Sequence, residues 1–346
     1  MPLYVYTIEQ SQQWDNVVRN FENHDVYYLS GYVKAFQLHG DGEPLLFYYD
    51  DEMIKGINVV MKRDIAEESY FSDKIDRGTF YDFITPYGYG GWLIEGDGAK
   101  DSLFLTYEKW CRDHNIVSEF VRYHPVLNNA GVTDSFYDLV MLGNTISMDL
   151  SSPEIIWANL TSKNRNMVRK AQKSGVKIYH GQFPAIYKTF EEIYNLTMLS
   201  DNASPYYYFE DVFYDSIRND LPEESQIFWA DLDGKIIAAA IMISANGYMN
   251  YHLSGSLRDY QHLAPSNLLL YKAALWGCFN GYRSFHLGGG VGSKEDSLYK
   301  FKSAFNRNEA KRFGIGKKIY LEDIYNNLVS MKKLNIESNF FPKYRV

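Results

Sequence analysis

The stretch QIFWADLDGKIIAAAIMISANGYMNYHLS, residues 226–254, decides the fold class of this chain. Two dipeptides, Asp233-Gly234 and Asn246-Gly247, separate three runs that are typical of β-strands. Asp-Gly and Asn-Gly pairs readily adopt the positive φ angles that tight hairpin turns require. The stretch therefore predicts a three-stranded antiparallel meander.

A helix and another strand follow the meander. The stretch APSNLLLYKAALWGCFNGY, 264–282, places its apolar side chains on a broad helical stripe, with Ser266 as the predicted N-cap and Gly281 at the C-terminal end. The run RSFHL, 283–287, then predicts a strand that stops at Gly288. Meander, helix and strand together predict an α/β (α+β) fold with mixed sheets flanked by helices.

The N-terminal half repeats this order with weaker signals. A duplicated α/β unit is the simplest explanation for two halves that share one order of elements. The predicted elements of the first half are a hairpin at 44–64, a strand with a glycine-rich loop at 81–92, a helix at 98–115 and a strand at 116–125.

We expect the two domains to join near residues 143–153. Ser152-Pro153 has the form of a helix cap followed by a first-turn proline, and it opens a predicted helix over 153–175. The predicted domains are 1–148 and 149–316, with the segment 317–346 folding back on the first. Because no proline- or serine-rich linker separates the halves, we expect them to pack closely around a cleft.

Composition limits the classes of protein that this chain can form. Its 346 residues suggest about two domains, and a hydrophobic content of 46% is enough for two cores. The net charge of −8 argues against a protein that is basic throughout, although a local basic face can still bind an anion. Cys111 and Cys278 are too few for a cysteine-rich zinc site or a disulfide framework. We find no secretion signal and no apolar run long enough to span a bilayer, so we expect a cytoplasmic protein.

The stretch FHLGGGVGSKEDSLYKFKSAFN, 285–306, carries the candidate chemistry. It lacks the Gly-Lys-Ser/Thr of a P-loop, because Ser293 precedes Lys294 and Glu295 follows it. The residues from Ser297 to Lys300 match the Ser-x-x-Lys of penicillin-binding enzymes, but the accompanying Lys-Thr-Gly is absent. The eight histidines lack metal-ligand spacing, so we predict no metal site. The remaining interpretation is the strand-to-helix turn of a transferase.

The order of elements around this stretch resembles the GNAT acyltransferase unit. In that fold a pyrophosphate binds at a helix N-terminus, which here corresponds to YQHLAPSNLLLYKAA. Ala264, Ser266 and Asn267 are the predicted donor-binding residues there. The usual Arg/Gln-x-x-Gly-x-Gly/Ala signature is absent, which argues against ordinary acetyl-CoA binding. Tyr299 resembles the tyrosine that protonates the leaving thiolate in that fold.

Five motifs carry a more specific resemblance. They are YHLSGS, LAPSNLLLYKAALWGCFNGY, FHLGGGVGSKEDSLYKFKSAFN, ITPYGYGG and LTSKNRNMVRKAQKSGV. Together they resemble the Fem-type family of tandem GNAT-like transferases, which build peptidoglycan interpeptide bridges. The likeness runs from about Tyr28 to Phe313 and is closest to the branch without a coiled-coil arm. Relatives often read Thr-Met-x-Arg where this chain has TMLS, so Ser200 replaces an arginine and the acceptor is expected to carry different charges.

The resemblance implies a function and a set of site residues. It implies aminoacyl transfer from aminoacyl-tRNA to an amine of a peptidoglycan precursor, in a cleft formed by both domains. Phe301 and Lys302 match the pair near the reacting ester, and Lys302 is the predicted cation for the developing oxyanion. Lys34 matches a lysine that contacts the precursor's phosphates. The further predicted substrate-binding residues are Tyr87, Gly88, Tyr207, His252, Gly288 and Gly289.

The sequence leaves other functions open. The first alternative is acyl-CoA-dependent N-acylation of an amino sugar or glycan precursor, with Tyr299 as the acid. A second is a catalytically inert module that binds a glycan or peptide through the tyrosine-rich stretch SPYYYF. Arg165, Arg169 and Lys173 lie at i, i+4 and i+8 of a predicted helix, so they share one face. That face is either a solvated surface or a track for RNA or a diphosphate. No covalently bound cofactor is expected, and contact with a lipid-linked precursor is expected to be peripheral.

Overall fold

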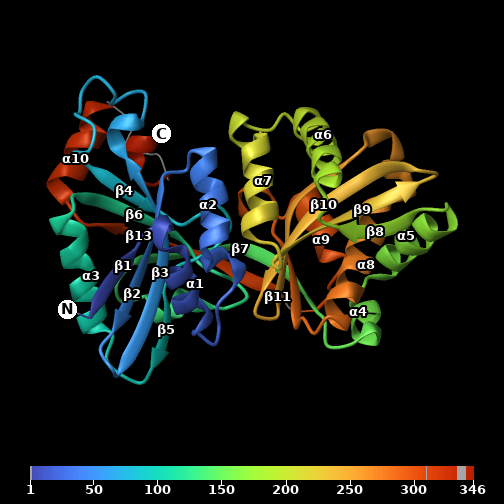
Figure 1. Cartoon of the computed structure of the whole chain (residues 1–346), viewed down its shortest axis with the longest axis horizontal. Helices are drawn as coiled ribbons and strands as arrows, with labels where there is room; N and C mark the ends of the chain where they lie inside the picture. The colour runs from blue at the N-terminus through green and yellow to red at the C-terminus, as the bar shows by residue number, and fades with distance from the viewer. Residues whose placement is uncertain (1, 309, 333–339) are drawn as a thin grey trace. The chain divides into compact units, whose positions relative to one another are not determined.

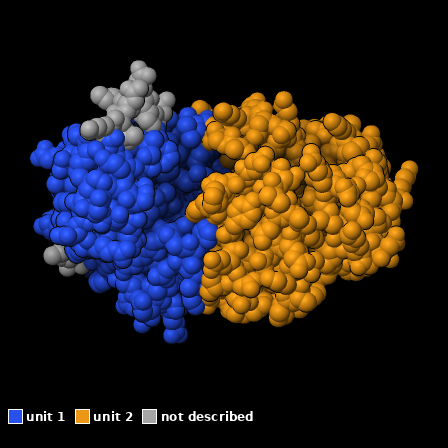
Figure 2. Space-filling model, turned by 90° about the horizontal axis from the view of Figure 1, so that it is seen from above, with its two compact units in different colours: residues 1–142, 313–346 blue, residues 143–312 orange. Residues whose placement is uncertain are grey.

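The structure is a computed structural model that describes residues 2–308, 310–332 and 340–346. The chain divides into two compact units, which are coloured separately in Figure 2. Unit 1 contains Met1–Leu142 and Phe313–Val346, and unit 2 contains Gly143–Arg312. The chain therefore crosses between units within strands β7 (Asp138–Asp149) and β13 (Lys311–Ile319). The predicted boundaries, at 148/149 and 316/317, fall inside the same two strands.

Unit 2 contains the predicted meander. The residues at both turns, Asp233-Gly234 and Asn246-Gly247, all have positive φ, between 49° and 83°. The dipeptides thus form the tight turns that the sequence predicts, and the strands on either side of each turn pair in antiparallel register. The three strands are β9 (Ser225–Leu232), β10 (Lys235–Ala245) and β11 (Tyr248–Ser256).

Helix α8 (Pro265–Phe279) connects β11 to the parallel strand β12 (Ser284–Gly288), as the sequence predicts. The predicted cap at Ser266 is wrong. The N-cap is Ala264, in the left-handed region at φ 59°, and Pro265 occupies the first turn, where its missing N–H costs no hydrogen bond. At the other end Gly281 has φ 79°, and the N–H of the next residue, Tyr282, donates to Gly277, which confirms the predicted terminus.

The helix predicted over 153–175 is two helices, α4 (Pro153–Asn159) and α5 (Ser162–Lys173). Ser152 caps the first, as expected, with its Oγ accepting from the N–H of Ile155 at 3.2 Å. Leu160 is extended and fully buried, and Thr161 caps the second helix. A buried side chain and a new cap therefore interrupt a stretch whose helical pattern looks continuous.

The two units share one topology. In each, six strands lie side by side, and the fourth and fifth are parallel and joined by a helix, whereas all other neighbours are antiparallel (Figure 1). The sixth strand of each unit is part of a segment that crosses the unit boundary. The order in unit 1 is β1 (Leu3–Tyr6), β2 (Glu43–Asp50), β3 (Ile54–Asp64), β4 (Tyr81–Ile84), β6 (Ile116–Arg122) and β13, with α3 (Asp101–Asp113) between β4 and β6. The order in unit 2 is β8 (Lys177–Gly181), β9, β10, β11, β12 and β7, with α8 between β11 and β12. The predicted duplication is therefore confirmed.

The other helices and strands of the two units have the residue ranges given below. Short helices and loops connect these elements, and no helix in the described part of the chain is both long and apolar enough for a membrane span. The remaining elements are α1 (Ser11–Arg19), α2 (Ser30–His39), β5 (Leu93–Gly96), α6 (Pro184–Ser200), α7 (Asp211–Asp220), α9 (Ser297–Ser303) and α10 (Glu322–Met331).

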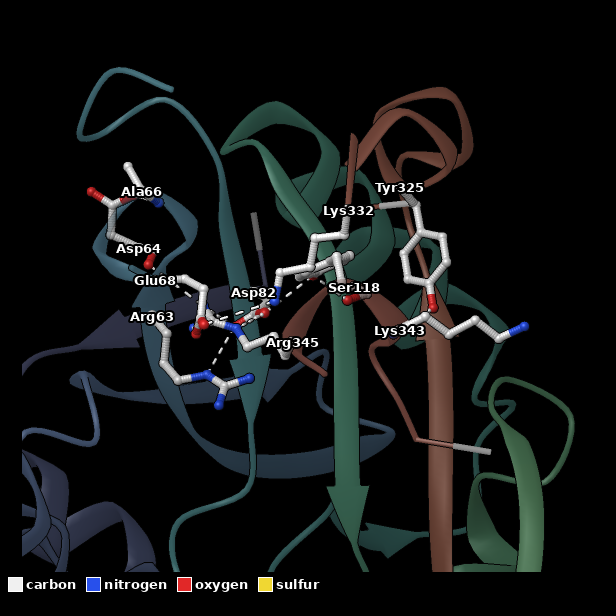
Figure 3. Close-up of polar contacts among 11 residues, drawn as sticks. Arg63, Asp64, Ala66, Glu68, Asp82, Ser118, Tyr325, Lys332, Lys343 and Arg345 are labelled. Atoms are coloured by element: carbon white, nitrogen blue, oxygen red, sulfur yellow. Dashed lines mark hydrogen bonds and ion pairs between the residues drawn. The ribbon is translucent and has the colours of Figure 1, made fainter. Parts of the chain in front are cut away.

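The C-terminal segment packs on unit 1 through a buried carboxylate (Figure 3). Asp82 is fully buried and accepts from Arg63 Nε at 2.9 Å, Arg345 Nε at 2.8 Å and the Tyr344 hydroxyl at 3.1 Å. Burial alone would raise the pKa of Asp82, but the two guanidinium groups hold it below its usual value. Residues 333–339 of the predicted tail lie outside the described residues.

Candidate functional site

A pocket of about 440 Å³ lies in unit 2, next to the parallel strand pair. The pairing of β11 with β12 covers only 248–250 and 284–286, and β11 continues to Ser256 along the pocket. Helices α6, α8 and α9 also contribute to the wall. Its volume lies within the range of small-molecule sites.

The pocket lining is mostly neutral. Of the described residues that line it, Asp201 carries the one carboxylate, and none is a lysine, arginine or histidine. Apolar side chains include those of Leu269, Leu298 and Phe301. The hydroxyl and amide side chains are those of Thr197, Tyr251, Ser254, Ser256, Gln261, Ser266 and Asn267. Such a lining can hydrogen-bond a neutral ligand rich in hydroxyls, but it offers no side-chain cation to a diphosphate.

The start of α8 faces this pocket with three of the predicted donor-binding residues, Ala264, Ser266 and Asn267. The first N–H groups of a helix have no partner within the helix and carry partial positive charge. This turn is therefore the electropositive part of the pocket wall.

Helix α9 brings Phe301 into the pocket, and the next residue of this helix, Lys302, is not among the lining residues. Lys302 is half-buried, and its Nζ donates to the carbonyl of Gly289 at 2.8 Å. Burial lowers the pKa of Lys302 to about 8, although the carboxylate of Asp296 acts in the opposite direction. Its side chain is thus not directed into bulk solvent, and it is protonated in most molecules at neutral pH.

The backbone before α9 favours glycine at three successive positions, because of a positive φ at the first and a lack of space for a Cβ at the other two. Gly288 has φ 77°. A Cβ on Gly289 would lie 2.9 Å from the carbonyl oxygen of Asn144, and one on Gly290 would clash with the carbonyl of Lys294 and with the carboxylate of Asp296. Asp296 in turn caps α9, accepting from the N–H of Tyr299 at 2.8 Å. The loop thereby fixes the start of the helix that carries Lys302.

Four of the predicted site residues of unit 2 line this pocket, namely Phe301, Ala264, Ser266 and Asn267. The other eight do not; they are Lys302, Tyr299, Tyr207, His252, Gly288, Gly289, Arg165 and Arg169. Tyr299 packs against the hydrophobic core of the unit. His252 lies at the point where β11 shifts register against β10, between Tyr251 and Leu253, and burial lowers the pKa of His252 to about 3. Tyr207 lies in a short 3₁₀-helix, one third exposed, with its ring against Tyr206. The roles predicted for them remain predictions.

The predicted basic face lies on α5. Arg165 donates to the carbonyl of Leu160 at 3.0 Å and so closes the end of α4, and Arg169 is exposed with its guanidinium 5.1 Å from the ring centroid of Trp157. The first turn of α5 reaches the pocket, because Asn164 accepts from the side chain of Asn267 at 2.8 Å. Arg165 thus stabilises the end of α4, a role that the i, i+4, i+8 spacing of the basic residues does not indicate.

The predicted residues of unit 1 lie together near α2. Lys34 is half-buried on this helix, whose Tyr32 donates to the carbonyl of Tyr87 at 2.6 Å and whose Phe36 stacks on the Tyr87 ring. Gly88 has φ 96°, and its carbonyl accepts from Arg122 at 2.9 Å. The glycine-rich loop is thus held by side-chain contacts to its backbone.

Sequence reasoning missed several pocket residues. Ser254 and Ser256 are part of the motif YHLSGS, whose small residues after an apolar strand were a usable signal. Thr197, Asp201 and Gln261 gave no such signal, because they come from α6, its C-cap and a 3₁₀-helix that only the folded chain brings together.

Comparisons with known proteins place a family match on the part of the chain that contains this pocket. Residues 162–303 match the family model described as an acetyltransferase (GNAT) domain. Unit 2 therefore contains a GNAT-type domain, and the protein is an acyltransferase. By sequence, no curated protein matches the chain.

Over most of its length the chain has the fold of proteins with tandem GNAT-like domains. It is similar to the crystal structure of FemX, with a TM-score of 0.69 and 12% identity, covering 94% of this chain and 99% of that one. It is also similar to the C-terminal domain of a putative lysylphosphatidylglycerol synthetase from Agrobacterium fabrum, with a TM-score of 0.56, 15% identity and coverage of 93% and 96%. A third similar structure is L-PGS from Bacillus licheniformis, with a TM-score of 0.51, 14% identity and coverage of 87% and 90%. The predicted fold is confirmed.

Proposed function

We propose that the protein transfers an aminoacyl group from aminoacyl-tRNA to an amine of a cell-wall (peptidoglycan) precursor. The observation that supports the choice of donor is a basic helix that begins at a pocket without side-chain cations. α5 has five cationic side chains and no acidic one, and its first turn is hydrogen-bonded to the pocket residue Asn267. The cationic residues are Lys163, Arg165, Arg169, Lys170 and Lys173.

The two surfaces suit two parts of a charged tRNA. A polynucleotide carries its negative charge along its backbone, which the exposed cations of α5 can follow. Its last nucleoside and the esterified amino acid carry no diphosphate, so they match a pocket lined by hydroxyl, amide and apolar groups. An acyl-CoA places a diphosphate in the donor site, where the pocket has a carboxylate and no side-chain cation.

The proposed chemistry is an aminolysis of an ester. The neutral acceptor amine attacks the carbonyl carbon, the C–N bond forms and the C–O bond to the ribose breaks. The ribose oxygen leaves with the proton that the amine loses. In this proposal Lys302 donates a hydrogen bond to the carbonyl oxygen as negative charge develops there, and loss of one such donor typically costs about 3–4 kcal/mol.

The acceptor is proposed from the resemblance of the motifs to the Fem-type family, and the similarity to FemX supports it. Lys34, Tyr87 and Gly88 in unit 1 are the residues proposed to bind it. A reaction that consumes aminoacyl-tRNA takes place in the cytoplasm, which is the proposed location, with at most peripheral contact with a lipid-linked precursor.

A direct experiment distinguishes the donors. The protein is incubated with a pool of charged tRNAs, a panel of acyl-CoAs and a peptidoglycan precursor with a free amine, and mass spectrometry identifies the donor that is consumed. We expect loss of aminoacyl ester and formation of an amide on the precursor. Release of free CoA with the esters intact would overturn the proposal in favour of acyl-CoA-dependent N-acylation, which the acetyltransferase family match supports.

The basic helix has its own test. Arg169→Gln with Lys173→Gln should lower the slope of log affinity against log salt by about 0.7–0.9 for each phosphate that the variant no longer neutralises. The matched control is Lys55→Gln with Lys109→Gln, two exposed lysines of unit 1. Equal slopes for both double variants would exclude α5 as the tRNA track.

A further inference from the structure

We propose that Asp201 selects donors that carry a free α-ammonium group, an inference that rests on the aminoacyl-tRNA donor proposed above. Asp201 is the C-cap of α6 and lines the pocket beside Thr197 and Met198 of the same helix. Its N–H donates to the carbonyl of Thr197 at 3.0 Å, which fixes the residue at the helix end.

The position of this carboxylate is unfavourable for the helix. The C-terminus of a helix carries partial negative charge, so an aspartate there is destabilising unless a cation is near. The last turn of α6 contains no basic residue. A cation bound in the pocket would relieve this repulsion and would meet both the carboxylate and the negative end of α6.

The chemistry of the reaction assigns that cation to the donor. The acceptor amine must be neutral to attack, and a carboxylate beside it would stabilise its unreactive ammonium form. The α-amine of an aminoacyl ester takes no part in bond formation and can remain protonated. Since Asp201 is the one carboxylate among the described lining residues, it is the group that distinguishes an aminoacyl ester from other acyl esters of the same size.

The test measures binding of three forms of one tRNA pool to the full-length protein. These are the charged pool, the same pool after nitrous acid has replaced each α-amine by a hydroxyl, and the uncharged pool. The hydroxyacyl form has nearly the same size as the aminoacyl form but no charge. The proteins are the wild type, Asp201→Asn and the control Glu192→Gln, which removes a charge from the exposed face of α6 outside the pocket. Thermal unfolding verifies that each variant is folded.

We expect the wild type and Glu192→Gln to bind the aminoacyl form about two- to fivefold more tightly than the hydroxyacyl form, as for an ion pair of an exposed carboxylate. Asp201→Asn should bind the two forms equally. If every protein prefers both charged forms over uncharged tRNA, but none distinguishes amine from hydroxyl, the inference about Asp201 is wrong and the donor proposal stands. If no protein prefers charged over uncharged tRNA, the donor proposal itself fails.

Discussion

Replacing Lys302 with methionine should stabilise the folded protein while it abolishes the proposed transfer. Methionine keeps the length of the side chain and removes its charge. Burial lowers the pKa of Lys302 from 10.5 to about 8, which means that the folded protein holds this proton less tightly than the unfolded chain does. The cationic form is therefore a cost to folding.

The magnitude and its pH range follow from the two pKa values. The difference between 10.5 and about 8, at about 1.4 kcal/mol per pH unit, gives a cost of about 3 kcal/mol. The cost is complete below pH 8, where both states are protonated. It disappears between pH 8 and 10.5, where the unfolded chain binds the proton and the folded protein does not. The methionine variant also loses the hydrogen bond to Gly289, about 1 kcal/mol, at all pH values below 8.

Thermal unfolding of both proteins at pH 7 and pH 10 measures the effect. A change of 1 kcal/mol moves the midpoint by about 2–4 °C in a domain of this size. We expect Lys302→Met to unfold at a higher temperature than the wild type at pH 7 and to lose most of this advantage at pH 10. Other titrating groups are common to both proteins and cancel in the difference. A methionine variant that is less stable at pH 7, with a gap unaffected by pH, would refute a buried, destabilised cation at this position.

Three further substitutions test other parts of the fold. Gly290→Ala should abolish transfer, because the new methyl group displaces Asp296 from the start of α9. The control is Gly131→Ala, whose new methyl group meets no atom within 4 Å. Equal transfer activity in the two variants would contradict this account. Asp82→Asn should destabilise unit 1 by about 3–5 kcal/mol at neutral pH, because it leaves two guanidinium groups without their carboxylate. Since the pKa of Asp82 is held low, the difference in unfolding free energy between wild type and variant should shrink only in strong acid. Urea unfolding at several pH values measures this difference. Burial raises the pKa of Glu119 despite hydrogen bonds from Tyr320 and other donors. The wild type should therefore gain stability relative to Glu119→Gln as the pH falls. A difference in thermal midpoint between the two proteins that stays constant with pH would count against this.

Much of the fold was predictable because its signals are local. A hairpin turn depends on the φ angles of two adjacent residues, which Asp233-Gly234 and Asn246-Gly247 supply themselves. The end of α8 at Gly281 and the cap at Ser152 depend on residues within one turn of the helix. The predicted site residues Phe301, Ala264, Ser266 and Asn267 also meet in one pocket, because short motifs place them at the ends of predicted elements.

The tandem order of strands and helices and the motifs of one pocket could thus be predicted from the residues alone. The folded chain was needed to show that the sixth strand of each unit belongs to a segment crossing the unit boundary, and that Asp201 shares the pocket with Phe301. It was also needed to show that the amine of Lys302 is buried enough to lower its pKa to about 8. The physical reason is that turns and caps depend on neighbours along the chain, whereas strand partners, pocket walls and desolvation depend on residues that are distant in sequence.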